Sequence, residues 1–402
     1  MTADSSTGID FPGESSMLID LGRQPVSNRF LADDEVAPEF QMRLMLDHAT
    51  GIIYLEQPFP LDELKPRYDW LTCFEPEDHL DDLVEQIMQL PRLGADALVG
   101  AYSFKDQSTL DRLAVKGLTN HYVIDPAEDL GISDPCANVE TYQSVFDSKK
   151  AGDIRAARGS ADIFVVRHVV EHAYDLMQFV EAVDALVRPG GYIVWELPDC
   201  ESAFIHGDCT TVWEEHIYYF TAFTFRNFLM QLGYTIDYFH SYPYALENSI
   251  TAIVHRDPST EKVVPDAAQL EAARMQASGF ASRLIGRKDE VRARLKALSS
   301  KGRVAIFGAG HLTVAFVSIL GVGEYIDVVL DDNENKIGKQ LAAGNIPIHG
   351  SEALYDDVSV CLLGLNPQNQ PKVVSKHSGF LETGGSFYTI FPETFSDDIK
   401  LL

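Results

Sequence analysis

The feature that most constrains this fold is a regular alternation of strand-like and helix-like runs between residues 95 and 255. Strands that alternate with helices form βαβ crossovers and a mainly parallel sheet. One helix is expected to end at Pro189-Gly190-Gly191, with the next strand beginning at Tyr192. The runs are, in order, ADALVGAY, TLDRLAVKG, HYVID, ADIFVVRHVV, DLMQFVEAVDALVRPGG, YIVWELPD, TFRNFLMQLGY and SITAIVHR.

The same alternation returns after Gly302, which predicts a second doubly wound α/β unit. Residues 266–299 are expected to form a long polar connecting helix. An amphipathic helix is expected at HLDDLVEQIMQL, with apolar Leu80, Leu83, Val84, Ile87 and Met88 on one stripe. Before it, partly alternating apolar residues and turn signals predict a small β-rich module. The predicted domains are therefore 1–76, 77–260 and 261–402.

Composition excludes several classes of protein. The net charge of -28, from 60 acidic and 32 basic residues, repels phosphate backbones and anionic lipid, so nucleic acid is not an expected partner. The leader MTADSSTGIDFPGESS has no basic or apolar region of a signal peptide, and no apolar run is long enough to span a membrane. The five cysteines form no CxxC pair, which argues against a cysteine zinc site. We expect a soluble cytoplasmic protein, either a monomer or a small homo-oligomer.

The turn after the first strand of the central unit follows Val99 and contains Gly100, Tyr102 and Phe104. A turn of this kind that binds a ligand needs glycine so that backbone can approach the ligand, and bulky residues cannot take the positive φ of a tight turn. The next strand ends at Asp125, where a carboxylate can accept both hydroxyls of a ribose.

The run Arg167-His168-Val169-Val170-Glu171-His172 follows another strand, at the edge where open α/β folds hold ligands. His168 and His172 have the i, i+4 spacing of one helical face, which is compatible with a metal pair. A well-placed third ligand is missing from the sequence, so lining of a cleft is favoured and no metal site is predicted.

The segment from Trp213 to Phe220, WEEHIYYF, is the densest functional candidate. A histidine beside an acid suits proton abstraction near neutral pH, and aromatic side chains shape an apolar pocket. The alternative is a packed aromatic segment with a solvated acid pair.

In the last unit, Gly308-Ala309-Gly310 follows a strand and opens a helix, a geometry that can receive an anion. The third glycine of a dinucleotide fingerprint is absent, although Asp331 and Asp332 end the next strand and could meet a ribose. Nucleotide contact and a purely structural turn both stay open, and an NAD-dependent oxidoreductase is kept as a minor alternative.

Together these residues resemble the three-domain sugar C-methyltransferases, which act on nucleotide-linked keto-sugars in deoxysugar biosynthesis. The resemblance covers nearly the whole chain. It implies a class I methyltransferase domain that uses S-adenosylmethionine and a Rossmann-like domain that helps to hold a nucleotide sugar. The family's zinc cysteines are missing, because Cys73 is the only cysteine before Cys136, so no zinc is expected. The motifs that carry the resemblance are LGRQPVSNRFL, VIDPAE, ADIFVVRHVVEH, LVRPGGYIVWELPD, WEEHIYYFT and VAIFGAG with LDDNENKIGKQL.

By this resemblance, His216 matches the general base, Glu215 the adjacent acid and Tyr68 the tyrosine of the N-terminal module. Residues expected to contact S-adenosylmethionine are Gly100, Tyr102, Asp125, Arg167 and His168. Residues expected to contact the substrate are Trp213, Tyr219, Asn248, Gly308, Gly310 and His311. The leading hypothesis is proton abstraction by His216 followed by methyl transfer to carbon; the rival is a noncatalytic member that binds a nucleotide sugar and assists another enzyme.

Overall fold

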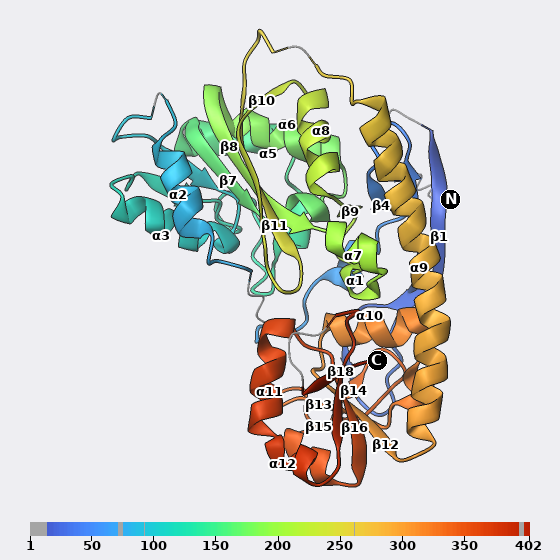
Figure 1. Cartoon of the computed structure of the whole chain (residues 1–402). Helices are drawn as coiled ribbons and strands as arrows, with labels where there is room; N and C mark the ends of the chain where they lie inside the picture. Colours follow the sequence, from blue (N-terminus) through green and yellow to red (C-terminus); the bar gives the residue numbers. More distant parts are fainter. Residues whose placement is uncertain (1–13, 71–74, 92, 261, 394–397) are drawn as a thin grey trace, which may run out of the picture. The chain divides into compact units, whose positions relative to one another are not determined.

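The computed structural model of the chain describes residues 14–70, 75–91, 93–260, 262–393 and 398–402 (Figure 1). This described part forms two compact units, each assembled from segments that are separate in the sequence. Unit 1 comprises the described residues up to Ser16, together with Leu46–Glu201 and Glu215–Arg274; unit 2 comprises Met17–Met45, Ser202–Glu214 and Met275–Leu402. The expectations for the leader and for Cys73 lie outside the described residues.

The sheet of unit 1 has the strand order β10-β11-β8-β7-β5-β6. β5 pairs in parallel with β6 and β7, and β7 pairs in parallel with β8. β11 is antiparallel to both β8 and β10. The predicted mainly parallel sheet is therefore confirmed. Its strands are β5 (Val99–Ala101), β6 (His121–Val123), β7 (Ala161–Arg167), β8 (Val187–Asp199), β10 (Tyr234–Tyr242) and β11 (Asn248–Arg256).

Both faces of this sheet are apolar, because successive side chains of a strand point to opposite sides. On one face, Val99, Ile163 and Val194 join a single buried cluster with α2 and α3. On the other face, the ring of Phe179 from α6 packs against Trp195, with 6.3 Å between ring centroids. The helices and helical turns of unit 1 are α1 (Leu61–Leu64), α2 (Leu80–Met88), η1 (Phe104–Asp106), α3 (Gln107–Val115), α4 (Val139–Gln143), α5 (Ser148–Arg158), η2 (Val170–His172), α6 (Leu176–Leu186) and α8 (Ala222–Gln231).

Two predicted helices can be compared with the structure residue by residue. The stripe along α2 is buried except at Met88, which is 36% exposed. α6 ends at Leu186, earlier than predicted, and β8 begins at Val187 and includes Pro189. Proline lacks an N–H group and disfavours helical conformation in the residue before it, so the helix ends ahead of Pro189.

Unit 2 contains a parallel sheet with the order β15-β13-β12-β16-β17-β18. This confirms the second doubly wound unit, and α9 confirms the long connecting helix. The strands are β12 (Arg303–Phe307), β13 (Val328–Leu330), β15 (Ile348–His349), β16 (Val358–Leu363), β17 (Ser386–Thr389) and β18 (Ile399–Leu401). The helices and helical turns are α7 (Glu201–His206), η3 (Cys209–Thr211), α9 (Ala267–Ser299), α10 (His311–Leu320), η4 (Gly323–Tyr325), η5 (Ser351–Tyr355), η6 (Pro367–Asn369), α11 (Gln370–Lys376) and α12 (Ser378–Glu382).

The predicted β-rich segment near the N-terminus does contain strands, but they are divided between the units. In unit 2, β2 pairs with β14, with Phe30 opposite Leu341; in unit 1, β4 pairs with β9, with Ile53 opposite Tyr219. The domain boundaries after residues 76 and 260 stay a prediction. The remaining strands are β1 (Ser15–Pro25), β2 (Phe30–Leu31), β3 (Glu39–Asp47), β4 (Ile53–Leu55), β9 (Tyr218–Tyr219) and β14 (Gln340–Leu341).

None of the described helices combines the length and the apolar character needed to cross a membrane.

Candidate active site

The segment that follows β7 lies at the carboxyl edge of the sheet in unit 1, where open α/β folds bind ligands. His168 has a φ of 51°, which is uncommon outside glycine, and its amide donates to the carbonyl of Glu196 at 2.7 Å. η2 begins only at Val170. Because the backbone turns at His168, the expectation that His168 and His172 share one helical face is wrong. Both imidazoles approach Glu171 Oε1, at 3.6 and 3.7 Å, but their other neighbours differ.

Five side chains gather beyond this turn, and we call Glu140, Glu171, His172, Glu215 and His216 the His172 cluster. His172 Nδ1 lies 2.8 Å from Glu140 Oε1, and His172 Nε2 lies 3.7 Å from Glu171 Oε1. The ring of His216 stands edge-on to that of His172, with centroids 4.8 Å apart and planes at 87°. Ligand atoms of Glu140, His172 and Glu215 also lie within 4.8 Å of one another. His216 is half-buried and the other four residues are buried, so within the cluster His216 is the side chain nearest to solvent.

Three separate segments position this cluster. Glu140 lies on α4, whose first turn is capped by Asn138 Oδ1 accepting from the amide of Thr141 at 3.1 Å. The amide of Ile217 donates to the carbonyl of Glu171 at 2.8 Å, which ties the segment carrying Glu215 and His216 to η2. The cluster is therefore fixed by backbone contacts and not only by its own charges.

The charge of Glu140 follows from its surroundings. Burial acts to raise the pKa of the Glu140 carboxyl, but the neighbouring imidazole of His172 outweighs it and the pKa is lowered. Glu140 is thus a carboxylate at neutral pH. This carboxylate lies 2.8 Å from Nδ1 of His172, while Nε2 of the same ring faces Glu171 at 3.7 Å.

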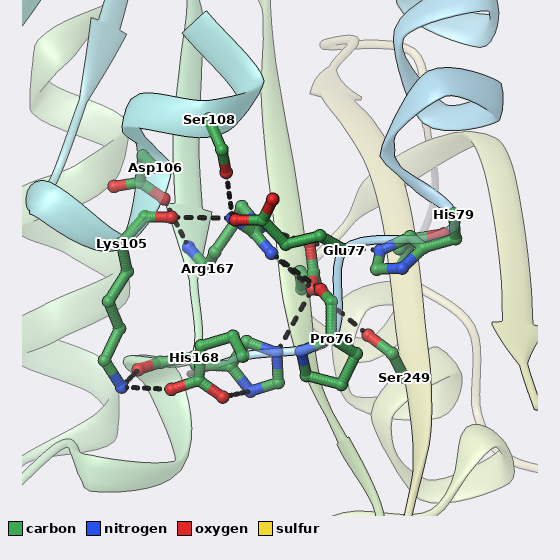
Figure 2. A network of polar contacts seen from close by, with 12 residues as sticks. Pro76, Glu77, His79, Lys105, Asp106, Ser108, Arg167, His168 and Ser249 are labelled. Carbon is green, nitrogen blue, oxygen red and sulfur yellow. Dashed lines mark hydrogen bonds and ion pairs between the residues drawn. The ribbon is translucent and has the colours of Figure 1, made fainter. Parts of the chain in front are cut away.

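A second group of polar side chains, most of them buried, surrounds Arg167 at the end of β7 (Figure 2). Arg167 donates from Nε and Nη2 to both carboxylate oxygens of Glu196, at 2.6 and 3.1 Å. Its remaining N–H groups donate to the carbonyls of Lys105 and Pro76 and to Ser108 Oγ, at 2.6, 3.1 and 3.1 Å. Burial alone would raise the pKa of Glu196, but the guanidinium and neighbouring imidazoles hold that pKa well below its usual range. We call the group the Glu196 network; it contains Glu75, His79, Lys105, Asp106, Arg167, His168, Glu196 and Ser249.

His168 belongs to this network as a charged imidazolium. Its Nε2 lies 3.1 Å from Glu196 Oε1 and its Nδ1 lies 3.5 Å from Glu75 Oε2. Lys105 Nζ lies 2.8 Å from Glu75 Oε1 and donates to the carbonyl of His168 at 3.1 Å. Burial opposes the charge, but the carboxylates of Glu75, Glu171 and Glu196 outweigh burial and raise the pKa of His168 to about 10.

The turn after β5 is closed by side-chain capping. The amide of Ser103 donates to Asp106 Oδ2 at 2.8 Å, and the amide of Lys105 donates to Ser103 Oγ at 3.3 Å. Asp106 is fully buried, and burial raises its pKa to about 7. No described residue of this turn has a positive φ, so Tyr102 and Phe104 do not strain it. The expectation that glycine is needed here for a positive φ is therefore wrong, because the capping contacts close the turn instead.

Comparison with known proteins agrees with this architecture. Residues 107–238 match the model of a methyltransferase domain, and residues 251–392 match the model of the C-methyltransferase C-terminal domain. C-methyltransferase NovU of Streptomyces niveus is 26% identical over 416 residues, which cover 94% of this chain and 93% of NovU. Over almost its whole length, the chain is therefore similar to a C-methyltransferase. It is an S-adenosylmethionine-dependent enzyme with a class I methyltransferase fold in unit 1.

Solved structures give weaker similarities. A class I S-adenosylmethionine-dependent methyltransferase from Listeria monocytogenes is 10% identical, with a TM-score of 0.28, over 51% of this chain and 71% of that chain. An O-methyltransferase family protein from Burkholderia thailandensis is 10% identical, with a TM-score of 0.29, over 45% and 56%.

The predicted ribose contact, Asp125, lies just after β6. Asp125 is half-buried, and its Oδ1 accepts from the amides of Ala127 and Glu128 at 2.8 and 2.7 Å. Within the described part of the chain, Oδ2 accepts no hydrogen bond, and the buried hydroxyls of Tyr102 and Tyr122 have no partner. A carboxylate oxygen suits the hydroxyls of a ribose. The role of Asp125 in holding the methyl donor stays a prediction.

The other residues predicted to contact S-adenosylmethionine make their contacts inside the protein. A Cβ on Gly100 would lie 2.6 Å from Phe164 Cδ2, so this glycine leaves room for a neighbouring ring. The ring of Tyr102 is fully buried and packs on Phe146 with centroids 5.1 Å apart, while Phe104 is 59% exposed. Donor contacts from Gly100, Tyr102, Arg167 and His168 stay predictions, and a contact to Arg167 would require breaking one of its internal hydrogen bonds.

In unit 2 the predicted substrate residues include one stacked pair. The rings of Trp213 and His311 have centroids 4.4 Å apart and planes at 21°. The next residue, Glu214, accepts from Ser27 N and Oγ at 2.5 and 2.9 Å, and burial raises its pKa to about 7. This contact anchors the chain directly before Glu215.

The glycine turn of unit 2 is held from within. The amide of Ala309 donates to Asp331 Oδ2 at 2.9 Å, and Lys336 Nζ donates to both Asp331 Oδ2 and the carbonyl of Ala309 at 2.9 Å. Gly308 has a φ of 103°, whereas a Cβ on Gly310 would meet open space. Asp331 thus supports the turn itself, and nucleotide contacts at Gly308, Gly310 and His311 stay predictions.

Three further predicted residues lie in unit 1. Tyr219 is buried on β9 with its ring centroid 6.3 Å from that of His216. Asn248 Oδ1 accepts from the amide of Tyr244 at 3.2 Å. Tyr68 is half-buried beside Trp70, with ring centroids 4.9 Å apart. The structure therefore brings Tyr219 close to the predicted base, and the roles of all three stay predictions.

Sequence reasoning did not identify Glu140 and Glu171 and assigned His172 to a different pair. Glu171 and His172 lie inside the quoted motif RHVVEH, but their neighbours come from α4 and from the segment before β9. Glu140 carries no sequence signal of its own.

Proposed function

We propose that this C-methyltransferase methylates a carbon beside the ketone of a nucleotide-linked sugar, with His216 as the general base. The observation that carries the proposal is the His172 cluster at the ligand-binding edge of a methyltransferase sheet. Removal of a proton from such a carbon requires a base that can reach the substrate. It also requires surroundings that stabilise the positive charge that the base gains when it takes the proton.

His216 meets the first requirement, because it is the half-buried member of the cluster. It takes the proton as the C–H bond breaks, and the electron pair moves into the enolate of the ketone. S-Adenosylmethionine, when bound, supplies the electrophilic methyl group for the nucleophilic carbon.

The second requirement is met by the buried carboxylates around His216. Glu215 precedes it in the chain, and Glu140 and Glu171 lie on either side of His172. Negative charge at these positions stabilises an imidazolium on His216 and lowers the cost of proton transfer. Tyr68 is placed by resemblance at the oxygen of the enolate.

Support for a nucleotide-linked substrate comes from the relationship to a C-methyltransferase along almost the whole chain, including the C-terminal domain. In unit 2, the open space at Gly310 and the stacked Trp213–His311 pair are compatible with an anionic group and a flat ring.

Hydrogen exchange tests the first half of the reaction. Nucleotide-linked keto-sugars are incubated with enzyme in D2O, with S-adenosylhomocysteine in place of the methyl donor, and deuterium beside the ketone is followed by NMR. The parent enzyme is expected to exchange that proton, and His216→Ala is expected to abolish both exchange and methylation. His255→Ala is the matched control, because His255 also pairs with a carboxylate, Asp237, but lies on β11. Exchange that persists in His216→Ala would exclude His216 as the base.

A further inference from the structure

The arrangement around His172 resembles that of a metal-ligating histidine. In such sites one ring nitrogen faces a carboxylate and the other binds the metal. Here Nδ1 of His172 faces Glu140 at 2.8 Å, and Nε2 faces Glu171 Oε1 at 3.7 Å. Glu140 thus occupies the position of the outer carboxylate, and Nε2 is aimed at a second acid.

Glu171 provides an independent observation. Its side chain is only 2% exposed, and in the described part of the chain neither of its carboxylate oxygens accepts a hydrogen bond. The nearest imidazole nitrogens, His168 Nδ1 and His172 Nε2, lie at 3.6 and 3.7 Å, beyond hydrogen-bond distance. The charged ring of His168 offsets the negative charge of Glu171, but hydrogen bonds from the described residues occupy neither of its oxygens, so both remain able to bind a metal ion.

His216 completes a set of three ligands. One ligand atom each from Glu171, His172 and His216 lies within 4.8 Å of the other two. Two ligand atoms on a tetrahedral zinc ion, at about 2.1 Å from the metal, are about 3.4 Å apart. The 3.7 Å between His172 Nε2 and Glu171 Oε1 is near this value, so small side-chain rotations would close the site.

We infer that Glu171, His172 and His216 form a binding site for one divalent transition-metal ion, with Glu140 as the outer partner of His172. Two imidazoles and one carboxylate suit Zn²⁺ or Co²⁺, whereas Mg²⁺ and Ca²⁺ prefer oxygen ligands alone. No metal was predicted from the sequence because a well-placed third ligand to the pair His168 and His172 was missing; the third ligand proposed here, His216, comes from the segment before β9.

Metal binding at this position inhibits the enzyme, because a nitrogen of His216 that binds metal cannot accept a proton. This consequence rests on the proposed function, whereas the binding of metal does not.

Cobalt titration tests the site directly. Full-length protein freed of metal by a chelator is titrated with Co²⁺, and the visible absorption of the bound ion is recorded. One ion per chain is expected, displaced by Zn²⁺ and without the sulfur charge-transfer band that cysteine ligands give. Glu140→Gln is expected to weaken binding by about 10- to 100-fold, as loss of an outer partner does. Glu171→Gln and His172→Gln are expected to weaken it further, and His255→Gln is expected to bind like the parent.

Melting temperatures of the metal-free variants show whether each variant is folded. If a ligand variant fails to fold, protection of His216 in the parent from diethyl pyrocarbonate by Zn²⁺, read by mass spectrometry, takes its place. Unchanged Co²⁺ binding in folded Glu171→Gln and His172→Gln, or absence of protection at His216, would overturn the site. Tight binding with no effect on deuterium exchange would leave the site standing and remove His216 from the role of base.

Discussion

Arg167 offers a quantitative test of the Glu196 network. Arg167→Met removes a guanidinium that donates to Glu196 through two N–H groups and to three other acceptors, and it leaves the fully buried Glu196 without its strongest partner. Breaking a buried ion pair in this way costs about 3–5 kcal/mol. In a domain of 150–250 residues, 1 kcal/mol changes the melting temperature by about 2–4 °C. The melting temperature is therefore expected to fall by about 6–20 °C.

Differential scanning calorimetry at pH 7 measures this change. The double variant Arg167→Met/Glu196→Leu is expected to regain at least half of the loss, because neither member of the Arg167–Glu196 pair is then buried without the other. Arg188→Met is the matched control: Arg188 pairs with Asp162, but their side chains are 31% and 24% exposed, so the loss is about 1 kcal/mol or less. The reasoning is refuted if Arg167→Met melts within about 2 °C of the parent, which is the shift for roughly 1 kcal/mol, or if the double variant is no more stable than the single one.

Three further predictions concern other positions. Gly100→Ala places a Cβ 2.6 Å from Phe164 and should destabilise the protein by about 1–3 kcal/mol in urea unfolding; a neutral result would mean that this packing is not tight. The pKa of His168 rises from 6.5 to about 10 on folding, so the stability that its charge gives the protein is complete below pH 6.5 and is lost as the pH rises through 10. The melting temperature should therefore fall between these pH values, and it should fall less steeply in His168→Gln. An equal dependence of the melting temperature on pH in the two proteins would contradict a charged His168. Asp125→Asn should weaken S-adenosylhomocysteine binding about tenfold in calorimetry, since a hydrogen bond to a charged group contributes about 1.5 kcal/mol or more; unchanged affinity would exclude the ribose contact.

The fold could be predicted because its signals are local. The alternation of strands and helices, the buried stripe of α2 and the long helix α9 all follow from periodicity within single segments. The end of α6 was placed too late, although the effect of Pro189 on the preceding residues was available from the sequence.

The candidate site could be predicted only in part, because its contacts join distant segments. His216 and Glu215 were identified from chemistry concentrated in one short motif. The partnership of His172 with Glu140 depends on the fold, which brings α4 to the end of β7. The turn after β5 did carry a local signal, since Ser103 and Asp106 have the spacing of a capping box. The capping hydrogen bonds close this turn without glycine.

The discontinuous make-up of unit 2 has a consequence for synthesis on the ribosome. Phe30 pairs with Leu341, and Ser27 binds Glu214. Strand β2 and the loop before it are therefore synthesised well before the residues with which they pair. The last segment of unit 1 ends at Arg274, 67 residues before Leu341, a stretch that takes about 3–13 s to translate at about 5–20 residues per second. During that interval the early strand is an unpaired edge. A nascent chain stalled before β14 should therefore be more readily cleaved by protease around Phe30 than one stalled after it.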